Sequence, residues 1–169
     1  MRMTNKAENV KLILELQKVS RTVIAQINAL EKLALALTSN IPPTSEQLLK
    51  FANSDHDEVI LSLLVSANRF GKQAKFGLGG RTSTLSASSI KDLRILRNLW
   101  EHRDEKPMGL NGKWLEDRRA NLRWLNDAYG ENWALAYSLT AGPADVRIGE
   151  RLSLKSLRAE AEHWLSIEV

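Results

Sequence analysis

One long apolar stripe near the start of the chain constrains the fold more than any other feature. Its residues recur at spacings of three and four, the pattern of one face of an α-helix. They are Leu12, Leu16, Val19, Val23, Ile27, Leu30, Ala34 and Leu37. Pro42 and Pro43 end this helix, because proline lacks an amide hydrogen and restricts the residue before it. Such a stripe predicts either a helix at the core of a helical domain or, over about four heptads, a helix–helix dimer contact.

The rest of the chain also follows mainly helical spacing. We expect a short helix over 44–52 and a second helix that opens with the acids of 55–58 and fades over 71–75. A third helix is expected over 90–100, capped by Ser88 or Ser89, and a fourth over 114–129. The last is expected over 154–165, capped by Ser153. Two apolar runs, 133–139 and 146–152, flank a Gly-Pro turn and predict a β-hairpin. The predicted fold class is therefore mainly α, with a small β-hairpin before the C-terminal helix. At 169 residues we expect a single domain over 1–169.

Composition narrows the class of protein and of site. The chain has no cysteine, which excludes disulfides, thiolate nucleophiles and cysteine-ligated metals. It shows no apolar signal segment and no apolar stretch of membrane-spanning length, so we expect a cytoplasmic protein with no membrane partner. Only three histidines occur, and the sequence Asp55-His56-Asp57 fits the opening of a helix better than a metal site. We therefore predict no metal and no cofactor.

Positive charge gathers in the middle of the chain. The formal net charge is +4; residues 59–90 carry four bases and no acid, and residues 91–123 carry nine bases and six acids. Such a distribution favours a polyanionic partner such as RNA. The Gly- and Ser-rich segment 77–89, flanked by Lys72, Lys75 and Arg81, is either a mobile loop or a segment that wraps RNA or a partner protein.

The residues most suited to chemistry lie on the helix predicted over 90–100. Arg94, Asn98 and His102 follow at steps of four, so a continuous helix aligns them on one ridge, and Arg97 borders the same groove. A groove lined by arginine, asparagine and histidine can hold a phosphate and transfer a proton near neutral pH.

The run from Arg97 to His102, with asparagine directly after the arginine, resembles the R-x4-6-H motif of the HEPN superfamily (higher eukaryotes and prokaryotes nucleotide-binding). The resemblance implies a HEPN-like helical bundle and a homodimer whose two motifs face each other across the interface. It also implies a metal-independent endoribonuclease of toxin or phage-defence type. In that case Arg97 holds the scissile phosphate, His102 is the acid/base catalyst and Asn98 orients the histidine or the backbone. Attack by the ribose 2′-hydroxyl then leaves 2′,3′-cyclic phosphate and 5′-hydroxyl ends.

The same resemblance makes Arg94 and Arg103 substrate-binding residues, and it implies RNA and an antitoxin or other partner protein as partners. Asp104 departs from the toxin pattern, which carries tyrosine two positions after the histidine. The alternative is a non-catalytic helical module for dimerisation or partner binding. In that reading Arg97 pairs with Glu101 four residues on, as is common on helix surfaces, and His102 is favoured by the helix dipole alone.

Overall fold

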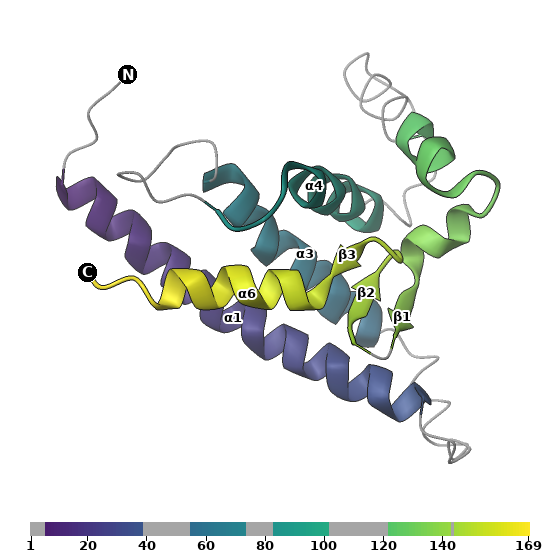
Figure 1. Ribbon diagram of the computed structural model, residues 1–169, viewed down its shortest axis with the longest axis horizontal. Coiled ribbons are helices and arrows are strands. Elements are labelled where there is room, and N and C mark those ends of the chain that lie inside the picture. Colours follow the sequence, from purple (N-terminus) through teal and green to yellow (C-terminus); the bar gives the residue numbers. More distant parts are fainter. Residues whose placement is uncertain (1–5, 39–54, 74–82, 102–121, 143) are drawn as a thin grey trace.

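The structure is a computed structural model that describes residues 6–38, 55–73, 83–101, 122–142 and 144–169. Figure 1 shows a mainly helical protein with a small sheet packed beside its last helix. The elements are α1 (Lys6–Thr38), α3 (Asp55–Gln73), α4 (Ala87–Glu101), a helix over residues 122–129, the 3₁₀ helix η1 (Trp133–Tyr137), β1 (Leu139–Ala141), β2 (Val146–Ile148), β3 (Leu152–Ser153) and α6 (Leu154–Leu165). The predicted mainly helical class is confirmed. The short helix expected over 44–52 lies outside the described residues.

The predicted apolar stripe is the buried face of α1. Val23, Ile27 and Leu30 have at most 1% of their surface exposed. This face packs against two helices, α3 and α6. Full burial of one such side chain stabilises the fold by roughly 1.5–3 kcal/mol. Of the two roles that the stripe predicted, the core helix is therefore the one observed.

Polar contacts fix how α6 lies on α1. The amide nitrogen of Gln17 donates to the carbonyl of Ile167 at 2.8 Å, while Arg158 bonds Glu31 at 2.6 Å. The early part of α1 thus meets the end of α6 and the later part meets its middle, so the two helices run antiparallel (Figure 1). None of the described helices combines the length and the apolar character that a membrane crossing requires.

Helices α3 and α4 complete the helical core. Leu63, Leu64 and Phe70 on α3 and Leu93 and Leu96 on α4 have no exposed surface, and the two helices pack on each other. The N-terminal cap of α4 is earlier than predicted: the hydroxyl oxygen of Ser86, and not that of Ser88 or Ser89, accepts the amide hydrogen of Ser89 at 3.1 Å. The helix therefore takes in the two serines that were expected to precede it.

A carboxylate inside the core ties the chain before α4 to α6. Glu160 has no exposed surface, yet its two oxygens accept three hydrogen bonds. The amide and the hydroxyl of Thr84 donate at 2.6 Å each, and the indole nitrogen of Trp164 donates at 2.7 Å. A buried polar group is tolerated only where hydrogen bonds replace its water. Thr84 therefore fixes the start of α4 against the last helix.

The sheet differs from the predicted hairpin in two ways. The prediction of a strand over 133–139 was wrong, because residues 133–137 form a 3₁₀ helix and only Leu139 joins β1. A third strand is also present, and the order is β1-β2-β3, antiparallel throughout. The cause is tertiary: the indole of Trp100 donates to the carbonyl of Ala136 at 3.2 Å and its ring lies 5.7 Å from that of Tyr137. These contacts outweigh the strand preference of the tryptophan and tyrosine in the run.

The turn between β2 and β3 joins three parts of the fold. Gly149 and Glu150 both have positive φ, 58° and 56°, and the amide of Arg151 donates to the carbonyl of Ile148 at 3.3 Å, as in a type I′ turn. The hydroxyl of Tyr129 donates to the carbonyl of Gly149 at 2.5 Å. The guanidinium of Arg151 bonds Asp92 on α4 at 3.3 Å. The turn therefore connects the sheet to the helix over 122–129 and to α4.

Replacing Gly149 by alanine tests this turn. A Cβ there would lie 2.8 Å from the Tyr129 hydroxyl, 2.9 Å from Leu96 and 3.1 Å from the Ala136 carbonyl. We expect Gly149→Ala to lower the free energy of unfolding by about 2–4 kcal/mol, from overpacking and left-handed backbone strain. The matched control is Gly130→Ala, with the same φ of 58° but nothing within 4 Å, which should cost only about 1 kcal/mol. Equal losses in urea unfolding would contradict the packing argument.

Burial of the Tyr129 phenol raises its pKa from 10.0 to about 12; Arg151 opposes this and Asp92 and Glu150 add to it. The folded state thus favours the neutral phenol, so this part of the stability is complete below pH 10 and is lost as the pH rises from 10 to about 12. In a Tyr129→Phe variant the group cannot ionise. We expect the difference in unfolding free energy between the two proteins to fall over this pH range. A difference that stays constant would contradict the burial.

Candidate functional site

The residues predicted for RNA chemistry lie on or directly after α4. Arg94, Arg97 and Asn98 are on the helix, and His102 and Arg103 lie outside the described residues. The structure therefore brings three of the five predicted residues together on one helical surface.

The buried face of α4 sets which of these side chains reach the solvent. Leu93, Leu96 and Trp100 face the core, and the hydrogen bond from Trp100 to Ala136 fixes the rotation of the helix. Arg94 is left exposed, and Asn98 is half-buried. The i, i+4 spacing predicted from the sequence thus corresponds to one polar ridge over an apolar face.

Arg97 is held by two neighbours on the same helix. One of its terminal nitrogens donates to the side-chain oxygen of Asn98 at 3.0 Å. The other bonds both carboxylate oxygens of Glu101, at 2.7 and 2.5 Å. The predicted Arg97–Glu101 pairing is therefore present, and the carboxylate balances the guanidinium charge. The arginine side chain keeps 30% of its surface exposed, so it remains accessible to a phosphate.

Two further cations lie on the exposed side of α4. Lys91 and Arg94 lie one turn apart on the helix, and neither forms an ion pair with another residue of the described ranges. Because the Arg97–Glu101 ion pair is neutral overall, the net positive charge on this side of α4 comes from Lys91 and Arg94. Lys91 was not among the predicted site residues, although its spacing of three from Arg94 was visible in the sequence.

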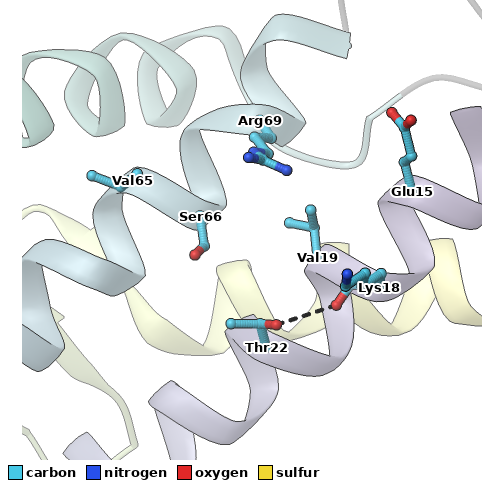
Figure 2. Close-up of a pocket in the computed structure, with 7 residues that line it drawn as sticks. All are labelled: Glu15, Lys18, Val19, Thr22, Val65, Ser66 and Arg69. Atoms are coloured by element: carbon cyan, nitrogen blue, oxygen red, sulfur yellow. Dashed lines mark hydrogen bonds between the residues drawn. The ribbon is translucent and has the colours of Figure 1, made fainter.

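A second surface, which the sequence did not reveal, is a groove between α1 and α3. Its volume is about 440 Å³ and seven residues line it: Glu15, Lys18, Val19, Thr22, Val65, Ser66 and Arg69. Figure 2 shows the guanidinium of Arg69 extending from α3 toward Val19 of α1. Glu15, Lys18 and Thr22 form a polar row beside the apolar stripe to which Val19 belongs, but only the packing of α3 turns that row into a groove.

The described part of each surface lacks the cluster of ligands that a metal site needs. Among the residues that the structure describes, no three histidine, aspartate or glutamate side chains are close enough together to hold a metal ion. The sequence Asp55-His56-Asp57 stands where it was expected, at the start of α3.

Comparison with family models, with curated proteins and with solved structures finds no match to this chain. The likeness to the HEPN motif therefore rests on the motif residues themselves, of which the structure describes those up to Glu101.

A double-mutant cycle tests how firmly Glu101 holds Arg97. The two side chains are 30% and 37% exposed, so water screens their attraction. We expect Arg97→Gln and Glu101→Gln to show a coupling of about 0.2–0.5 kcal/mol in urea unfolding, falling in high salt. A coupling well above about 1 kcal/mol would mean that the arginine is a structural residue and not available to a ligand.

Proposed function

We propose that this chain is a metal-independent endoribonuclease with a HEPN-like helical bundle. The observation that carries the proposal is the pair formed by Arg97 and Asn98 near the end of α4, five and four residues before His102 in the chain. The exposed Arg94 one turn earlier adds positive charge on the same helix.

The proposed chemistry needs no metal, because the side chains supply both charge and protons. Arg97 binds the scissile phosphate, and Arg94 and Arg103 bind neighbouring phosphates. His102 removes the proton of the ribose 2′-hydroxyl, whose oxygen attacks the phosphorus. The bond from phosphorus to the 5′-oxygen breaks, and that oxygen takes up the proton that His102 has accepted, so the histidine acts first as base and then as acid. The products are a 2′,3′-cyclic phosphate and a 5′-hydroxyl end.

In this proposal the active form is a homodimer acting in the cytoplasm, with the two motifs facing each other and an antitoxin or other partner protein as regulator. The phosphate has to displace Glu101 from at least one guanidinium nitrogen of Arg97. A surface ion pair of this kind contributes well below 1 kcal/mol, so a phosphate with two hydrogen bonds can compete with it.

The second candidate is a non-catalytic helical module for dimerisation or partner binding, with the same fold. The ion pair between Arg97 and Glu101 favours it, because that pair accounts for the arginine without any substrate.

The two functions are separated by incubating purified protein with total RNA in EDTA. We expect the wild type to cleave, and His102→Ala to lose at least about 100-fold in rate, since a general acid/base contributes 10²- to 10⁴-fold. Arg97→Gln should lose activity as well. Arg21→Gln is the matched control, because it removes an exposed cation from α1, away from the motif.

Cleavage that survives in His102→Ala would contradict the assigned catalyst. The absence of cleavage by the wild type, at concentrations where it is dimeric, would leave the binding module as the function.

A further inference from the structure

The groove between α1 and α3 carries hydrogen-bond donors from both of its walls. Lys18 contributes an ammonium from α1, and Arg69 a guanidinium from α3. Both side chains are exposed, and among the described residues neither has an ion-pair partner. Ser66, one turn before Arg69 on the same wall, adds a hydroxyl. Two cations and a hydroxyl that line one groove from two helices supply the donors that a phosphate site needs.

The same groove carries acceptors on the α1 wall. The hydroxyl of Thr22 donates to the carbonyl of Lys18 at 3.3 Å, so its oxygen lone pairs remain for a ligand (Figure 2). Glu15 adds a carboxylate on the same wall. Inorganic phosphate at neutral pH offers only one or two P–OH donors to these oxygens, whereas a sugar offers several hydroxyl donors spread over its ring. The ligand that satisfies both groups of residues carries a phosphate and hydroxyls.

The size and shape of the groove agree with such a ligand. A volume of about 440 Å³ lies within the roughly 300–1,000 Å³ of small-molecule sites. Val19 and Val65 provide apolar contact, and Val65 is 42% exposed. One turn after Thr22 on α1 and one turn before Ser66 on α3, the amide nitrogen of Gln26 donates to Ser62 at 2.5 Å and bridges the two helices.

We propose that this groove binds a phosphate ester on a hydroxylated scaffold, as in a nucleotide. Lys18, Arg69 and Ser66 bind the phosphate, while Glu15 and Thr22 accept hydrogen bonds from the sugar. The site uses none of the α4 residues, so it goes beyond the proposed function and does not depend on cleavage.

The test is calorimetric titration of the protein with inorganic phosphate, ribose 5-phosphate and AMP. We expect AMP and ribose 5-phosphate to bind more tightly than inorganic phosphate. Lys18→Gln and Arg69→Gln should each weaken binding by about tenfold, since each removes a charge-assisted hydrogen bond. Arg21→Gln, the same charge change on an exposed position of α1 outside the groove, should leave it unchanged.

The Glu15→Gln variant tests the phosphate-binding and the sugar-binding residues of the groove separately. The change removes a negative charge near the phosphate, so inorganic phosphate should bind more tightly to the variant. The affinity for ribose 5-phosphate should rise less or fall, because a neutral amide accepts hydrogen bonds from the sugar hydroxyls more weakly than a carboxylate does. Equal gains for both ligands would contradict the role given to Glu15.

Two further results would contradict the proposed site. The first is no binding of AMP at millimolar concentration. The second is an equal loss of affinity in Arg21→Gln and Arg69→Gln, which would reflect surface charge alone. A short RNA, with and without a 5′-phosphate, then identifies the source of the phosphate. Titrating it into His102→Ala keeps the RNA intact if the proposed cleavage occurs. Binding that needs the 5′-phosphate indicates a terminal nucleotide, and binding without it indicates the RNA backbone.

Discussion

The packing of one apolar stripe against two helices is the interaction on which the rest of the structure depends. The stripe on α1 is wide enough to serve α3 and α6 together, and Val23 and Ile27 lose all contact with water as a result. With α3 in place, α4 packs on its other side, and with α6 in place the small sheet has a helix to lie on. The positions of the polar ridge of α4 and of the groove beside α1 therefore both follow from the way α3 and α6 pack on this stripe.

The sequence predicted the elements whose stabilising pattern is local. The stripe of α1, the acid-led start of α3 and the capping serine of α6 are each visible within one segment, and Ser153 does accept the amide of Ser156 at 3.0 Å. The prediction of a strand over 133–139 failed because the conformation of residues 133–137 is set by Trp100, more than thirty residues away. The turn at Gly149 and Glu150 was missed for a related reason: a glutamate with positive φ gives no turn signal of its own.

The two candidate sites differ in the same way, because one depends on local spacing in the sequence and the other on the packing of two helices. The pairing of Arg97 with Glu101 follows from a spacing of four on a helix, so the sequence sufficed to predict it. The groove combines residues of α1 with residues of α3 that lie about fifty positions later, and no spacing rule relates them. Lys18 and Arg69 look like ordinary surface charges until the two helices are brought together antiparallel.

The contact between α1 and α6 also has a consequence for how the protein is made. Gln17 and Ile167, which bond each other, are 150 residues apart. A ribosome adding about 5–20 residues per second completes α1 about 6–23 s before it adds the first residue of α6. Throughout that interval one side of the stripe has no partner from its own chain. The nascent protein therefore presents part of the apolar face of α1 to the solvent, a surface of the kind that chaperones bind during translation.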